Sequence, residues 1–156
     1  MWYKQKYGLI MGEHVEDTAR RNGRKDLVYL GYMERNVVLT NNSNRIIKVC
    51  HPGGGSSYAL SHTGQKIIDS YEDYEKPDIL LIGHYHKASY LPNYRGVAII
   101  QTGCTQEPTP FMRKKRLHAD LGGWIVSVGL DKNDNITGIN TEFISYTPRP
   151  WQNRLA

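Results

Sequence analysis

Three histidines follow apolar runs of the sequence, and their placement favours metal binding. His84 and His86 are one residue apart and follow the apolar residues 78–83, while His51 follows residues 46–50. Side chains one residue apart project to the same side of an extended chain, so both imidazoles of the pair could reach one metal ion or two adjacent ones. Neutral imidazoles suit manganese, zinc, iron or nickel. We therefore predict that a divalent transition metal, one ion per chain, is bound by His51, His84 and His86.

Glycines accompany these histidines. Gly83 removes a side chain that would crowd the pair, and Pro52 with the three glycines at 53–55 lets the backbone turn sharply beside His51. A lone loop histidine is usually a hydrogen-bonded surface residue. The prediction of a metal site depends on the combination of apolar run, glycine and histidine at both places.

Other polar residues near these motifs have two interpretations each. Four basic residues either contact substrate phosphates or form a solvated loop; they are Arg113, Lys114, Lys115 and Arg116. His118 follows this run, and His62 is more typical of a solvated or capping position. Tyr85 either stacks on a base or packs at the rim of the site. Thr102, at the end of an expected strand, is a candidate to orient a ligand imidazole.

The elements that must position these residues begin with a short helix over residues 12–21, where apolar side chains recur at helical spacing. An apolar run predicts a strand over 26–31. Residues 37–39 and 46–50 flank the turn at 41–44 and predict a hairpin.

The rest of the chain predicts strands around one more helix. The expected elements are a helix that Pro77 ends, strands over 78–83 and 97–103, an exposed connection over 106–121, and a hairpin from 124–128 and 136–146. This order predicts a layered α/β fold with flanking helices and a C-terminal antiparallel hairpin. In such sheets, ligands gather at the carboxyl ends of strands, where His51 and the His84/His86 pair are expected.

Length and composition limit the class of protein to which the chain can belong. The 156 residues have the size of one domain, and we predict a single partial domain over 1–146 with an extended tail over 147–156. The 39% hydrophobic and 22% charged residues exclude a disordered chain, and the net charge of +5 permits an anionic partner. No apolar run has the length of a membrane helix and no signal peptide is recognisable, so we expect a cytoplasmic protein without a membrane partner. Cys50 and Cys104 are expected as buried thiols.

The sequence resembles a known family at its histidine motifs. Gly-His-Tyr-His at residues 83–86 resembles the Gly-His-x-His motif of calcineurin-like metallophosphoesterases, and His51 is similar to the single histidine that precedes that motif. The resemblance covers residues 27–146 and implies the C-terminal half of that domain. It also implies that His51 and His84 face a second metal while His86 faces the first.

Residues 101–115 are similar to the phage-type and archaeal-polymerase-small-subunit branches of the family. The family's N-terminal motifs are absent: no aspartate stands two residues before a histidine, and no asparagine precedes one. Gly12-Glu13-His14 lies in an expected helix and is not a functional substitute. Met1 stands just after the point where the Asn-His motif would lie. A bridging carboxylate is needed to hold two cations about 3.5–4 Å apart.

The expected function is therefore that of a metal-dependent phosphoesterase fragment, a phosphodiesterase or nuclease-like hydrolase. We expect it to be inactive alone unless another chain supplies the missing Asp and Asn-His ligands, and no catalytic residue is assigned. The alternative is a non-catalytic binding or assembly module with a metallophosphoesterase fold; an interrupted gene product is a third interpretation. Expected partners are a phosphodiester or nucleic acid, and another chain or a second copy at an exposed strand edge.

Overall fold

The computed structural model describes residues 6, 8–55 and 57–147. Its chain divides into two compact units, Met1–Arg35 and Asn36–Ala156. The sequence predicts a single partial domain over 1–146, and this division into compact units does not test that prediction. The predicted tail over 147–156 lies outside the described residues except for Thr147.

The first unit contains the predicted helix, α2 (Met11–Arg21). The strand predicted over 26–31 is wrong, because this segment has no strand partner. Instead, the backbone N–H of Tyr29 donates to the Glu16 carboxylate at 2.7 Å. The Tyr29 ring lies against Gly12, where an added Cβ would come within 2.1 Å of it. Tyr29 is thus the residue through which the segment 26–31 contacts helix α2.

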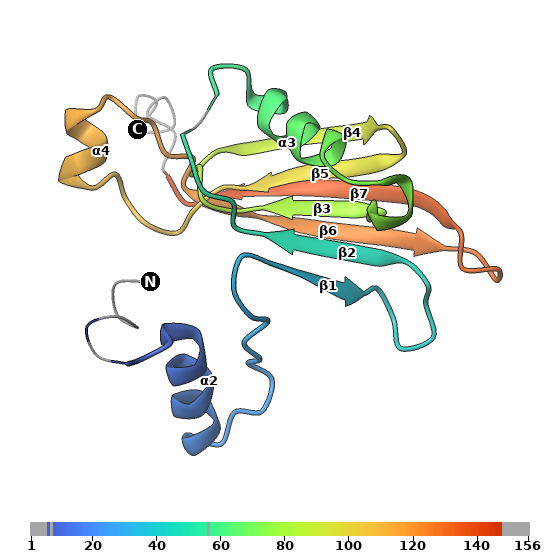
Figure 1. The fold of residues 1–156 in the computed structure, drawn as a ribbon, viewed down its shortest axis with the longest axis horizontal. Coiled ribbons are helices and arrows are strands. Elements are labelled where there is room, and N and C mark those ends of the chain that lie inside the picture. Colours follow the sequence, from blue (N-terminus) through green and yellow to red (C-terminus); the bar gives the residue numbers. More distant parts are fainter. Residues whose placement is uncertain (1–5, 7, 56, 148–156) are drawn as a thin grey trace, which may run out of the picture. The chain divides into compact units, whose positions relative to one another are not determined.

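The second unit is built on a five-stranded mixed sheet. Its strands are β1 (Glu34–Val38), β2 (Ile46–Cys50), β3 (Ile79–Ile82), β4 (Ala88–Tyr94) and β5 (Val97–Thr102), in the order β1-β2-β3-β5-β4. The three central strands β2, β3 and β5 are parallel, and β4 is antiparallel to β5. The carboxyl ends of β2, β3 and β5 consequently lie at the same end of the sheet, the end toward α4 (Pro110–Lys114) in Figure 1.

Both faces of this sheet are covered. Helix α3 (Leu60–Asp69) packs on one face through Ile68, which is fully buried among side chains of β3 and β5. A second, two-stranded antiparallel sheet of β6 (Gly122–Leu130) and β7 (Ile136–Ser145) packs on the other face. There, Trp124 and Val126 contact the layer around Ile100. The coarse prediction of a layered α/β fold with a C-terminal hairpin is confirmed.

Three details differ from the sequence prediction. Helix α3 ends at Asp69, and a separate 3-10 turn, η1 (Asp73–Glu75), follows it before Pro77. Strand β4 was not expected, because residues 88–94 mix polar, aromatic and proline residues. The connection over 106–121 is not exposed throughout, since Met112 and Ala119 are buried and α4 forms within it.

Both cysteines are free thiols; Cys50 is buried and Cys104 is half-buried. The expectation of two unpaired cysteines is therefore confirmed, although only one of them is fully covered. Among the described residues, no helix has the length and apolar character needed to cross a membrane.

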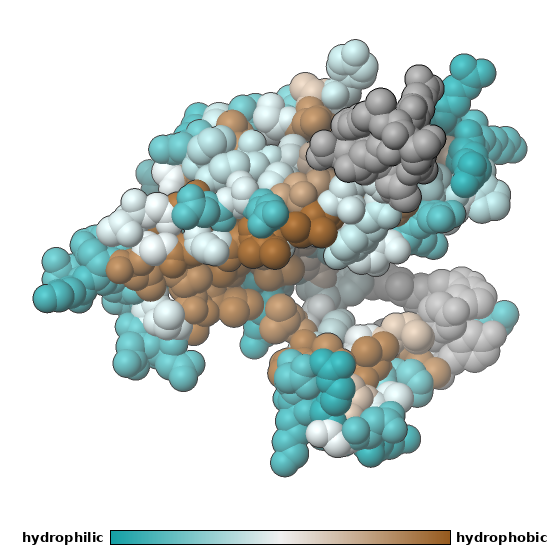
Figure 2. Space-filling model, turned by 180° about the vertical axis from the view of Figure 1, so that it is seen from behind, coloured by the Kyte–Doolittle hydropathy of each residue, from teal (hydrophilic) through white to brown (hydrophobic). Residues whose placement is uncertain are grey.

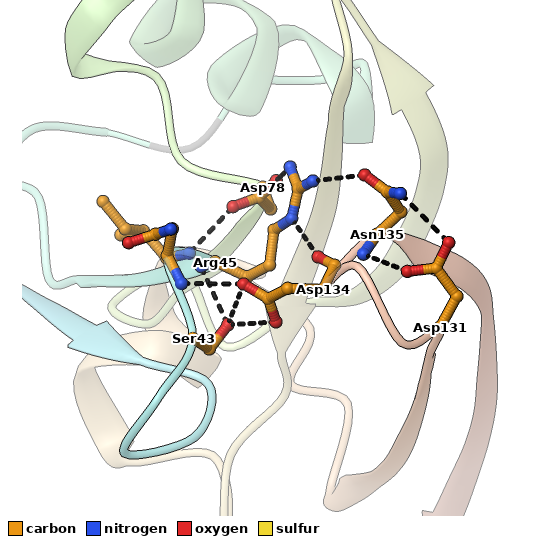
Figure 3. Close-up of polar contacts among 8 residues, drawn as sticks. Ser43, Arg45, Asp78, Asp131, Asp134 and Asn135 are labelled. Atoms are coloured by element: carbon orange, nitrogen blue, oxygen red, sulfur yellow. Dashed lines mark hydrogen bonds and ion pairs between the residues drawn. The ribbon is translucent and has the colours of Figure 1, made fainter.

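A polar network ties the two sheets together at the end of the strands away from α4 (Figure 3). The Arg45 guanidinium donates to the Asp134 carbonyl at 2.6 Å, to the Asn135 side chain at 2.9 Å and to Asp78 at 3.1 Å. The Asp134 carboxylate in turn accepts from the Ser43 hydroxyl at 2.8 Å. The turn between β1 and β2, the start of β3 and the turn between β6 and β7 are thereby joined.

Candidate metal site and adjoining pocket

The parallel strands β2 and β3 bring two of the predicted ligands together. Cys50 and Ile82 are register partners at the ends of these strands, and Gly83 N–H donates to the Cys50 carbonyl at 2.9 Å. His51 and His84 therefore leave the sheet from neighbouring positions. The expected placement of both histidines at strand carboxyl ends is confirmed.

The two imidazoles meet edge-on, with their planes at 76°, and they are hydrogen-bonded to each other at a nitrogen–nitrogen distance that two ligands of one ion would also have. Nε2 of His51 and Nδ1 of His84 are 3.3 Å apart, and the ring centroids are 5.1 Å apart. Two nitrogens bound tetrahedrally to one zinc ion at about 2.0–2.1 Å lie about 3.3–3.4 Å apart. Nε2 of His84 lies 3.0 Å from the Gly54 carbonyl and donates to it in the matching tautomer. Metal-bound histidines commonly use the second nitrogen in this way.

His86 stands beside this pair with an unsatisfied nitrogen. Its Nδ1 is buried and has no hydrogen-bond partner, and a buried polar atom without a partner is costly. Among the described residues, however, no three His, Cys, Asp or Glu side chains lie where they could jointly hold a metal ion. His51 and His84 therefore form a pair of candidate ligands in the part of the chain that the structure describes. His86 lies next to them but does not share an ion with them in this arrangement.

The backbone of the motif is strained. His84 has φ of 77° and His86 has φ of 55°, both in the left-handed region. The prediction that the pair projects from an extended chain is therefore wrong, because the chain leaves β3 at Gly83 and turns at each histidine. Residues other than glycine adopt this conformation at a cost, and such positions cluster at functional sites.

Gly83 makes room for the His51 ring, as expected. A Cβ at this position would lie 3.1 Å from Nδ1 of His51. Burial lowers the pKa of the His51 imidazole below its usual value, and repulsion from His84 and His86 lowers it further. His51 is therefore neutral near pH 7, the form that a metal requires of an imidazole.

Tyr85 holds the glycine turn against the motif. Its hydroxyl donates to the Gly53 carbonyl at 3.1 Å, and its ring meets the His84 ring edge-on with centroids 5.0 Å apart. Burial raises the pKa of the Tyr85 phenol, so the hydroxyl keeps its proton. The tyrosine thus borders the site and fixes the turn.

A pocket of about 500 Å³ opens beside the histidine pair. One side is formed by the motif and the glycine turn, and the other by the segment that contains α4. The lining includes His84, Tyr85, His86, Lys87, Phe111 and His118. This volume lies within the range of about 300–1,000 Å³ that is typical of ligand pockets.

The remaining predicted residues have different places. The four basic residues at 113–116 are exposed on and after α4, next to the pocket, but none of them lines it. The hydroxyl of Thr102 bonds to the Ile82 carbonyl at 3.3 Å and does not orient an imidazole. His62 is exposed on α3.

Sequence reasoning missed several contributors to the pocket. Lys87 and Phe111 line it, and Asp120 anchors its far wall by donating its N–H to the His86 carbonyl at 2.9 Å and accepting from Ala88 at 2.8 Å. Lys87 follows the motif directly and could have been noticed. Nothing in the local sequence signals the roles of Phe111 or Asp120.

Comparison with known proteins adds little. No family model matches the sequence, and no curated protein matches it. A solution NMR structure of a protein from Thermotoga maritima aligns with a TM-score of 0.36 and 18% identity. The alignment covers 83% of this chain and 59% of that one, so the chain spans less than two thirds of that protein. Similarity at this level transfers neither fold nor function.

Proposed function

We propose that this chain is the metal-binding half of a calcineurin-like metallophosphoesterase and takes part in hydrolysis of a phosphodiester, as a phosphodiesterase or nuclease-like module. The single observation that carries the proposal is the 3.3 Å separation of Nε2 of His51 and Nδ1 of His84 at the ends of two parallel strands. The Gly-His-Tyr-His motif at residues 83–86 supports it.

His51 and His84 would hold the ion, and His86 would complete the set through its unpartnered Nδ1. A divalent ion held by these residues would supply positive charge to a phosphoryl oxygen and would lower the pKa of a bound water. The chain's own contribution is positional: the Gly54 carbonyl orients the His84 ring, and the pocket beside it receives the phosphoester.

Hydrolysis needs carboxylates that the described site residues do not provide. We propose that another chain or another segment supplies them and that one ion, manganese, zinc, iron or nickel, binds weakly in their absence. Purified protein should then show little hydrolysis of a nitrophenyl phosphodiester with manganese. Robust turnover that disappears in His84→Ala would contradict the need for this further contribution.

A second function, a non-catalytic assembly module, is favoured by one specific observation. Strands β6 and β7 pair with no other strand among the described residues, and only the start of β6 has a further backbone partner, since the Gly122 N–H donates to the Cys104 carbonyl at 2.9 Å. Within the described chain, the rest of both outer edges of this sheet is free. Free edges are sites at which another chain can add a strand. The two functions are compatible if the added chain is the one that supplies the carboxylates.

Metal stoichiometry tests the proposed site. Elemental analysis after dialysis against zinc should find about one ion per chain, and the His51→Ala/His84→Ala double variant should lose it. His14→Ala is the matched control, because His14 lies on α2 in the other unit and is exposed. Equal zinc content in the double variant and the control would refute the site.

A further inference from the structure

A second pocket adjoins the histidine pocket across the glycine turn. It has a volume of about 530 Å³. Gly54, Gly55 and Tyr85 line both pockets, so the two hollows lie on either side of one shared wall. A ligand longer than one pocket can therefore pass over the turn from one hollow into the other.

Helix α3 forms the outer side of the second pocket. His62 and Lys66 are four residues apart on this helix and therefore lie on the same face. Both line the pocket and both are exposed. Thr63 and Ser57 add hydroxyl groups to the same lining. Lys66 thus gives the second pocket a cationic group, and His62, Thr63 and Ser57 give it hydrogen-bonding groups. Neither His51 nor His84 lines it.

The charged side chains that line the two pockets have one sign. Among the described residues that line them, none is Asp or Glu, while Lys87 lines the first and Lys66 lines the second. The His118 ring, which also lines the first pocket, lies 3.2 Å from the Asp120 carboxylate. Lys66 is exposed and Lys87 is half-buried. Lysines spaced along a groove favour a ligand with several negative charges. The whole chain carries a net charge of +5, which has the same sign.

Aromatic rings accompany these cations. Phe111 lines the first pocket with 63% of its surface exposed, and the Tyr85 ring borders both pockets. An exposed phenylalanine in a cationic groove is the arrangement on which nucleic-acid bases stack. The ligand that matches both features is a polymer in which phosphates alternate with flat rings.

We propose that the two pockets form a continuous groove that binds single-stranded nucleic acid, with one phosphate beside the histidine pair and a neighbouring phosphate beside Lys66. The position of the reacting phosphate rests on the proposed function. Binding of the strand rests on Lys66, Lys87 and Phe111 and requires no metal. The two ideas therefore have separate tests.

The test measures binding of a fluorescently labelled oligothymidylate of about eight nucleotides by anisotropy, with the full chain, in EDTA and at low salt. Lys66→Gln should weaken binding about three- to tenfold and reduce the slope of log K against log salt by about 0.7. Lys132→Gln removes the same charge from the turn between β6 and β7 and should change the affinity less than about twofold. Equal affinities of these two variants would overturn the groove.

A second arm separates nucleic acid from a general polyanion. Phe111→Ala should weaken binding of the oligothymidylate about fivefold or more, because one stacked base is lost. It should leave binding of inorganic polyphosphate unchanged. If polyphosphate competes as well as the oligonucleotide and Phe111→Ala alters neither, the groove is a general anion site and the nucleic-acid assignment is wrong. Because EDTA is present throughout, failure of metal binding would not affect either result.

Discussion

At the scale of residues, the site depends on two short distances at the ends of β2 and β3. The His51 and His84 nitrogens are 3.3 Å apart, and the position of the His51 ring is set by the missing side chain at Gly83. Left-handed backbone at His84 and His86 then aims the motif away from the strand. Small changes at these positions should therefore alter metal affinity before they alter the fold.

Gly83→Ala tests this dependence. The added Cβ would lie 3.1 Å from Nδ1 of His51 and should push the ring away from His84, so we expect zinc affinity to fall about tenfold with little change in the unfolding midpoint. Titration calorimetry with zinc measures the effect. Gly53→Ala is the matched control, because an added Cβ there meets nothing within 4 Å. Equal losses in both variants would show that the whole turn, and not the Gly83 contact, sets the affinity.

The sequence predicted the residues of this site better than their conformation. Apolar runs before His51 and His84 placed both at strand ends, because buried parallel strands have a recognisable pattern. The left-handed turns at His84 and His86 were not predictable, since histidine rarely adopts them and only the surrounding structure enforces them. The basic residues at 113–116 were identified by charge alone, which cannot tell a pocket wall from the solvent side of a helix.

At the scale of elements, the Arg45 network connects two turns and the start of β3, which are distant from one another in sequence (Figure 3). The Arg45 side chain is only 33% exposed, and it forms three bonds to groups from β3 and from the turn between β6 and β7. Asp78 also accepts the Ile46 N–H at 2.8 Å. The network should therefore align the two sheets and, through them, the strand ends that carry the histidines.

We expect Arg45→Ala to destabilise the protein by about 1.5–3 kcal/mol, the usual range for hydrogen bonds to charged groups. Urea denaturation followed by circular dichroism measures the change. Arg95→Ala is the control, because Arg95 forms an ion pair with Asp69 at 3.1 Å while 59% exposed. Its loss should cost less than about 1 kcal/mol. A smaller effect at Arg45 than at Arg95 would show that the network does not hold the sheets together.

Element prediction succeeded where periodicity was strong and failed where tertiary contacts decide. Strands β3, β5, β6 and β7 and helix α2 lie within two or three residues of their expected bounds. Strand β4 exists because β5 offers it a partner, since its own residues, Ala88–Tyr94, include a proline and no apolar alternation. The run at 26–31 is the converse case, an apolar stretch without a partner strand.

At the scale of the whole molecule, the second sheet is small and its apolar surface is incompletely covered. Seen from behind, apolar side chains form a band across the sheet-bearing unit (Figure 2). Between the two sheets a cleft of about 400 Å³ is lined by Leu81, Ile100, Trp124 and Val126. On the outer face of the hairpin, Ile125 is 56% exposed. The cleft and Ile125 lie on opposite faces of the hairpin, and exposed apolar surface on a sheet is where another chain can pack.

Self-association is the expected consequence for the isolated protein. Sedimentation velocity over a range of concentrations should show a dimer or larger species, and Ile125→Lys should weaken association at least about tenfold. Tyr74→Lys serves as control, because Tyr74 is 87% exposed and belongs to η1, not to β6 or β7. A wild-type chain that stays monomeric at high concentration would argue against pairing between copies and leave a different chain as the partner.

The central claim is that the histidines at the ends of β2 and β3 bind one metal ion, and anomalous X-ray diffraction at the zinc edge tests it most directly. Crystals grown with zinc should give one strong anomalous peak about 2.0–2.1 Å from both Nε2 of His51 and Nδ1 of His84. The Nδ1 atom of His86 should then turn toward the same peak. A map with zinc bound elsewhere, and with the two rings still hydrogen-bonded to each other, would contradict the account.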